Sequence, residues 1–144
     1  MAQAGIYLAE LGWRGDIEDM VRTLAPFGTF ATNMALAIDI GAGVGPKIGL
    51  ECYMDERRRP QATASWIGLL DELVAQGMCT PAERDALLAW PGVEQTTQFI
   101  WARTFTRGLN HLKVVYQPGR PVVAKAYWGF IHQVSGADRV AGPA

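Results

Sequence analysis

The sequence from residue 112 to residue 131 reads LKVVYQPGRPVVAKAYWGFI. Apolar side chains recur at every second position from Leu112 to Tyr116, which is the period of a strand with one buried face. Residues 118–121, Pro-Gly-Arg-Pro, have the composition of a turn, and a second alternating run follows from 122 to 131. The stretch predicts a β-hairpin, whose apolar face needs another layer to cover it.

A second hairpin is predicted between residues 34 and 54. Two alternating runs are joined there by the glycine-rich segment 41–46. This segment is not a dinucleotide-binding loop, because Pro46 replaces the third glycine of GxGxxG and a strand follows instead of a helix. The positions that predict the buried face are Met34, Leu36, Ile38, Ile40, Ile48, Leu50, Cys52 and Met54.

Three segments have the spacing of helices. The first is capped by Asp16, and we expect Pro26 and Gly28 to stop it. The second begins near residue 62 and ends at Gly77. The third opens with Thr80-Pro81-Ala82-Glu83, a capping box with proline at the first helical position. The apolar stripes of the first two are Ile17, Met20, Val21 and Leu24, and Trp66, Leu69, Leu70, Leu73 and Val74.

Two hairpins on either side of two helices predict an α+β fold. We expect a four-stranded antiparallel sheet with helices packed on one face, formed by a single domain over residues 1–144. Residues 93–108 suit a helix turn or an extended segment equally and receive no assignment. A disordered tail is expected from about residue 137.

The composition is that of an ordinary folded domain. Of the 144 residues, 49% are hydrophobic and 19% are charged, values that argue against disorder. The net charge of -1 provides no basic field for a nucleic-acid backbone. No apolar run approaches the roughly 20 residues of a membrane-spanning helix, and no signal-peptide pattern opens the chain. We expect a cytoplasmic protein with neither nucleic-acid nor membrane partners.

Neither a metal site nor a catalytic motif is evident. The two cysteines and two histidines are widely spaced and form no zinc pattern, and we expect no cofactor. Cys52 falls on the predicted core face, where cysteine is usually a small apolar residue. Cys79 precedes a helix N-terminus, which can lower a thiol pKa, but a structural role is favoured because no basic partner is evident.

The open face of the predicted sheet is the candidate binding surface. Its residues are those out of phase with the core, together with His111, which is placed at the start of a strand. Tyrosines provide contact area at low entropic cost, and lysines favour an acidic peptide. The candidate peptide-binding residues are Lys47, Glu51, Tyr53, His111, Lys113, Lys125 and Tyr127, with Asp39 and Gln117 on the same face.

Two other interpretations of this face stay open. An antiparallel sheet often keeps one face in water, with charges pairing across strands, so Glu51 beside a lysine is then an ordinary surface pair. Alternatively, Asp39 and Glu51 on paired strands form a carboxylate pair that divides acid and base roles, or a lysine acts as a base, in a small cofactor-free cyclase or isomerase.

Three stretches carry a resemblance to a known group of proteins. They are residues 45–53 (GPKIGLECY), 86–92 (ALLAWPG) and 110–121 (NHLKVVYQPGRP). Through them, the region of about residues 34–131 resembles uncharacterised proteins encoded beside peptide-modifying enzymes in bacterial natural-product clusters, and among characterised proteins the crocagin-type peptide-binding proteins. The resemblance implies a non-enzymatic accessory protein that holds a ribosomally made precursor peptide while it is modified. The implied partners are the precursor peptide or a tailoring enzyme, and a homodimer stays open as well.

Overall fold

The computed structural model describes residues 2–54, 64–96 and 103–134. This part of the chain has a five-stranded sheet and four helices. The predicted class, α+β with an antiparallel sheet, is confirmed, but the predicted number of four strands is wrong. The predicted tail from about residue 137 lies outside the described residues. The elements are α1 (Ala2–Glu10), α2 (Ile17–Gly28), β1 (Asn33–Ile40), β2 (Val44–Tyr53), α3 (Ala64–Ala75), α4 (Pro81–Ala89), β3 (Gly92–Thr96), β4 (Arg103–Tyr116) and β5 (Val123–Val134).

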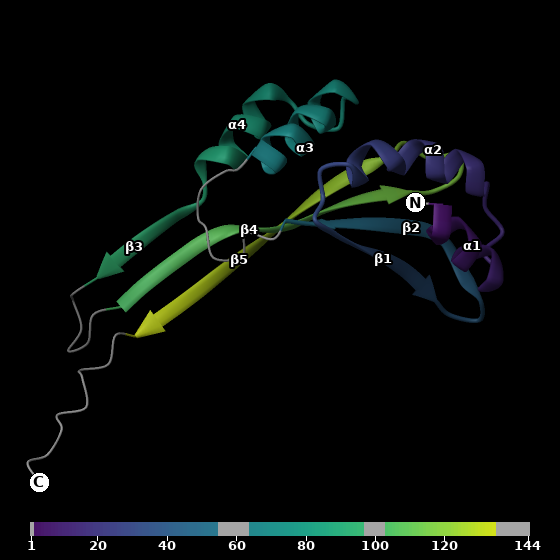
Figure 1. Cartoon of the computed structure of the whole chain (residues 1–144), viewed down its shortest axis with the longest axis horizontal. Coiled ribbons are helices and arrows are strands. Elements are labelled where there is room, and N and C mark those ends of the chain that lie inside the picture. The colour runs from purple at the N-terminus through teal and green to yellow at the C-terminus, as the bar shows by residue number, and fades with distance from the viewer. Residues whose placement is uncertain (1, 55–63, 97–102, 135–144) are drawn as a thin grey trace, which may run out of the picture.

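Strand β4 is the centre of the sheet. Along one edge, its first half pairs with β3 and its second half pairs with β2, which in turn pairs with β1. Along its other edge, β4 pairs with β5 from end to end. All of these pairs are antiparallel. Figure 1 shows the result: β3 and the adjoining ends of β4 and β5 extend away from the helices as an arm.

A β-bulge divides β4 into two phases. Leu109 lies opposite Trp128 and His111 lies opposite Tyr127, so Asn110 is the extra residue. We call the side of the sheet that the helices cover the helix face, and the other side the open face. Odd-numbered residues of β4 lie on the helix face before the bulge and on the open face after it, because one added residue reverses the alternation of side chains. The placement of His111 at the start of a strand is therefore wrong, since eight residues of β4 precede it within the 14-residue strand.

One hydrophobic core joins the sheet to the helices. Met20, Leu24 and Phe27 of α2 and the four buried residues of α3 belong to the same cluster as residues of β2 and β4. Among the predicted positions of β1, Leu36 and Ile38 pack against this cluster. Met34 and Ile40 were predicted to be buried and are 47% and 76% exposed. They lie near the two ends of β1, an outer strand, and Ile40 follows a shift of register.

The helix ends follow local chemistry, with one exception. Gly77 has the positive φ of 72° that glycine permits, and the Met78 amide donates to the Leu73 carbonyl, closing α3. The predicted capping box at Thr80 is confirmed. Pro26 does not stop α2, which continues to Gly28. A proline in the last turn removes only one backbone hydrogen bond of the helix. No helix was predicted over residues 2–10, where α1 forms; its Leu8 is fully buried in the core.

Candidate functional site

The open face of the sheet carries two rows of side chains that run across the strands. Cross-strand register places Tyr53 of β2 beside His111 of β4, and His111 beside Tyr127 of β5. The next row aligns Glu51, Lys113 and Lys125 on the same three strands. Six of the seven residues predicted for this site therefore lie together in two rows across β2, β4 and β5. Side-chain pairs of this kind, directly across neighbouring strands, usually stabilise a sheet.

The first row is a stack of rings. The Tyr53 and His111 ring centroids are 4.8 Å apart with planes tilted by 31°. His111 and Tyr127 are stacked at 4.3 Å, with only 11° between their planes. Tyr127 is 39% exposed, so this row ends at the outer strand with an accessible aromatic ring. Such a ring offers a partner a large contact area of fixed geometry.

The second row is held by polar contacts. The Tyr53 hydroxyl donates to Glu51 Oε2 at 2.8 Å, and Lys113 Nζ lies 3.4 Å from Glu51 Oε1. The predicted pairing of Glu51 with a lysine is confirmed, and such a surface pair is worth about 0.5 kcal/mol. Gly49 makes room for it, because a Cβ atom there would lie 2.3 Å from the Lys113 Cε atom. Within the described residues, the exposed Lys125 has no ion-pair partner.

The surroundings of Glu51 and His111 determine their protonation states. The Tyr53 hydrogen bond, together with Lys113, lowers the pKa of Glu51, which therefore stays ionised. Burial lowers the pKa of His111, which favours the neutral ring. The His111 Nδ1 atom is buried and has no hydrogen-bond partner within the described residues. A catalytic acid at neutral pH needs a raised carboxyl pKa, so Glu51 does not fit that role.

The predicted carboxylate pair of Asp39 and Glu51 does not form. Ala35 is the residue opposite Glu51, and Asp39 lies four residues further along β1, roughly 13 Å away at the rise of a strand. Lys47 is also four residues from Glu51 on β2 and stands apart from the two rows. Gln117 follows the last residue of β4. Sequence phase contained no information about the position of these residues along the strands.

Within the described residues, strand β5 has an unpaired outer edge along its whole length. Its 12 residues pair with β4 on one side, and on the other side no strand of the described chain pairs with it. Several of its apolar residues are open to solvent, including Val123 at 46%, Phe130 at 72% and Ile131 at 45% exposure. Proline and lysine residues usually protect such an edge from pairing with another strand. Strand β5 contains no proline and only one lysine.

A cavity of about 390 Å³ lies between α4 and the helix face of β4 and β5. Leu87 and Trp90 line it from the helix side, and Ala124, Ala126 and Trp128 line it from β5. The Trp90 ring lies 4.2 Å from the Trp128 ring and 5.4 Å from the Phe130 ring. Sequence reasoning assigned this face to the core, and the two small alanines on an otherwise apolar strand were the only signal of a space there.

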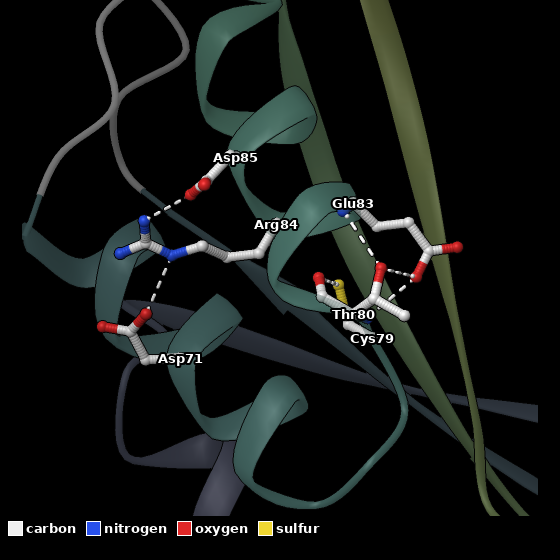
Figure 2. A network of polar contacts seen from close by, with 6 residues as sticks. All are labelled: Asp71, Cys79, Thr80, Glu83, Arg84 and Asp85. Atoms are coloured by element: carbon white, nitrogen blue, oxygen red, sulfur yellow. Dashed lines mark hydrogen bonds and ion pairs between the residues drawn. The ribbon is translucent and has the colours of Figure 1, made fainter.

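The polar network next to this cavity is structural. Figure 2 shows the Glu83 amide donating to the Thr80 hydroxyl, while the Thr80 amide donates to the Glu83 carboxylate. Arg84 joins the two helices by donating to Asp71 of α3 at 2.9 Å. The Cys79 thiol donates to the Thr80 carbonyl, and burial and the nearby Glu83 raise its pKa. Cys79 is therefore a thiol and not an activated nucleophile.

Comparison with known proteins identifies no relative: no family model, no curated protein and no solved structure matches this chain. The resemblance to crocagin-type proteins thus stays a prediction. In the described part of the chain, no helix has the length and apolar character needed to cross a membrane. Across residues 2–54, 64–96 and 103–134, no group of three or more His, Cys, Asp or Glu residues is placed to hold a metal ion.

Proposed function

We propose that this protein binds an extended peptide along the free edge of β5 and does not itself catalyse a reaction. The observation that carries the proposal is the unpaired edge of a 12-residue strand with exposed apolar side chains. Such an edge presents a row of backbone donors and acceptors, to which a peptide adds as a further strand. Backbone hydrogen bonds supply affinity in this mode, and the side chains on the two faces supply specificity.

The open-face rows end at this same edge. Lys125 and Tyr127 lie on β5 itself, and Lys113 and His111 lie one strand further in. A peptide on the edge would therefore contact the exposed tyrosine ring and the lysine without an ion pair. Lys113 lies opposite Lys125, and Glu51 is paired with Lys113, so one positive charge of the row is left for a partner. This charge favours an acidic residue in the peptide.

The biological ligand follows from the resemblance described above. On that ground we assign the peptide to the class of ribosomally made precursors, and the chain to the accessory proteins that hold a precursor for a tailoring enzyme. The alternative, a small cofactor-free cyclase or isomerase on the same face, is less well supported. Its carboxylate pair is not formed, and Glu51 has a lowered pKa.

The test begins with an array of acetylated decapeptides of random sequence. The tightest binders are synthesised again with a single N-methyl group at each position in turn. In an added strand, alternate amides point at the neighbouring strand and the others point away. We therefore expect N-methylation to abolish binding at every second residue and to be tolerated between them. Tolerance at every position, or no binding peptide at all, would contradict strand addition.

Protein variants test the same site from the other side. Tyr127→Ala should weaken binding by about 1–2 kcal/mol, as expected for an aromatic anchor that the bound peptide buries. Lys125→Gln should weaken it modestly, and added salt should reduce the difference, because solvent screens an exposed charge. Lys47→Gln is the matched control, since it removes the same charge on the same face away from β5. Mass spectrometry of the same mixtures detects catalysis: a product that forms with the chain alone and disappears with Glu51→Gln would establish the enzyme instead.

A further inference from the structure

The cavity between α4 and β5 lies directly beside the free edge. Three residues of its wall, Ala124, Ala126 and Trp128, come from β5, the outermost strand. They occupy alternate positions and so share the helix face of the sheet. Ala124 and Ala126 pair with the buried Val114 and Leu112, yet their own side chains are too small to fill the space below α4.

The size and lining of the cavity suit apolar side chains. An empty apolar cavity of about 150 Å³ is enough to bind benzene. The present cavity, at about 390 Å³, has room for two side chains of the size of leucine. Of its polar residues, Glu83 is bound to Thr80 through Oε2, and the Cys79 thiol donates to the Thr80 carbonyl. The other lining residues from the helices and strands are mainly apolar.

The two faces of β5 impose a pattern on any added strand. Residues directly opposite Ala124 and Ala126 would point to the helix face, towards the cavity. The residue between them, opposite Lys125, would point to the open face. Lys125 is exposed and has no ion-pair partner among the described side chains, so its charge is complementary to a carboxylate. The face that contains the cavity is apolar, and the face that contains Lys125 is positive.

We propose that the cavity between α4 and β5 is a binding site for two apolar side chains of an extended peptide, in the order apolar, acidic, apolar. The inference rests on strand addition at β5, and it adds the sequence class of the ligand. The apolar pair enters the cavity between Leu87, Trp90 and the two alanines. The acidic residue pairs with Lys125 on the other face, and this alternation sets the register of the peptide.

The test uses three acetylated, amidated heptapeptides, with two threonines on each side of a central triplet. The triplets are leucine-glutamate-leucine, alanine-glutamate-alanine and leucine-threonine-leucine. Affinity is measured by titration, following the NMR signals of Ala126 and of the Trp90 and Trp128 side chains. We expect the alanine peptide to bind about tenfold or more weakly than the leucine peptide, because less apolar surface is buried. Removing the glutamate should weaken binding to the wild type but not to Lys125→Gln.

Two variants change the cavity itself. Ala126→Leu fills it from β5, and should reduce the affinity for the leucine peptide to that for the alanine peptide. Ala75→Leu, which adds the same side chain at an exposed position of α3, is the matched control and should change neither affinity. Leu87→Ala enlarges the cavity from α4, and should shift the preference from the leucine peptide to a fourth heptapeptide with the triplet tryptophan-glutamate-tryptophan. Circular dichroism and the urea midpoint establish that each variant is folded. If Ala126→Leu does not fold, the peptide preference of Leu87→Ala tests the cavity proposal instead.

The outcomes separate this inference from the proposed function. If N-methylation acts at alternate residues while leucine and alanine peptides bind equally, strand addition stands and the cavity inference is overturned. N-acetyl-leucine amide tests the cavity without a strand. If that amide shifts the Trp128 and Ala126 signals while no peptide binds, the cavity stands as an apolar site and strand addition is overturned. If neither the amide nor any peptide binds, both are overturned.

Discussion

Replacing Leu70 by alanine tests whether the apolar side of α3 is part of the core that also contains residues of the sheet. Leu70 is fully buried in α3, within one core cluster with residues of β2 and β4. Its neighbours in α3, Leu69 and Leu73, are buried as well, so little room exists for the site to collapse after truncation. Leu→Ala changes at such sites cost about 3–5 kcal/mol through lost transfer energy and the remaining cavity. For a chain of this length, that cost lowers Tm by roughly 6–20 °C.

The assay is urea unfolding, followed in parallel by tryptophan fluorescence and far-ultraviolet circular dichroism. The midpoint should fall while the m-value stays constant, which identifies a change of stability and not of compactness. Leu11→Ala is the control, because Leu11 is 38% exposed and the same truncation should cost much less there. A loss below about 0.5 kcal/mol for Leu70→Ala, the size of a surface effect, would refute the assignment of this side chain to the core.

Two further predictions follow from the caps and the ring stack. Thr80→Ala should lower stability by about 1 kcal/mol through loss of the capping box, with peptide binding unchanged; a loss of binding at constant stability would instead assign Thr80 to a site. Burial lowers the pKa of His111 in the folded state, so the unfolded state takes up the proton first as the pH falls. Stability should therefore decline below about pH 6.5, less steeply in His111→Phe, whereas His132→Gln controls for the other histidine. Equal pH profiles for the wild type and His111→Phe would contradict this account of the burial of His111.

The elements that local chemistry defines were predictable from the sequence. Thr80 and Glu83 make a capping box from residues three apart, and Gly77 takes the one backbone conformation that other residues avoid. Alternation over 112–131 gave the β4–β5 hairpin, and the stripe from Trp66 to Leu73 gave the buried face of α3. These signals need only the residues within a few positions of one another, so they are present in the sequence itself.

The first half of β4 could not be predicted, and the reason is the bulge at Asn110. Before it, the odd residues Phe105, Arg107 and Leu109 share a face with even residues of β5, and after it the even residue Leu112 does so. The alternation of apolar and polar residues changes phase at this point. The 14-residue strand therefore looks like an irregular segment in the sequence. Strand β3 was missed for a different reason: its central residues are exposed to solvent, and it begins at Gly92, within the helix-stopping pair Pro91-Gly92.

The candidate site shows the same division between sequence and tertiary structure. Phase along the chain determined that Glu51, Tyr53, Lys113 and Tyr127 share one face of the sheet. Only the pairing of β2, β4 and β5 decided which of them meet, because the register of β2 against β4 is set by contacts between segments more than 50 residues apart. Pairing also separated Asp39 from Glu51, left β5 at the edge and put α4 over two alanines. The sequence determined the faces, and the packing of distant elements determined the positions on them.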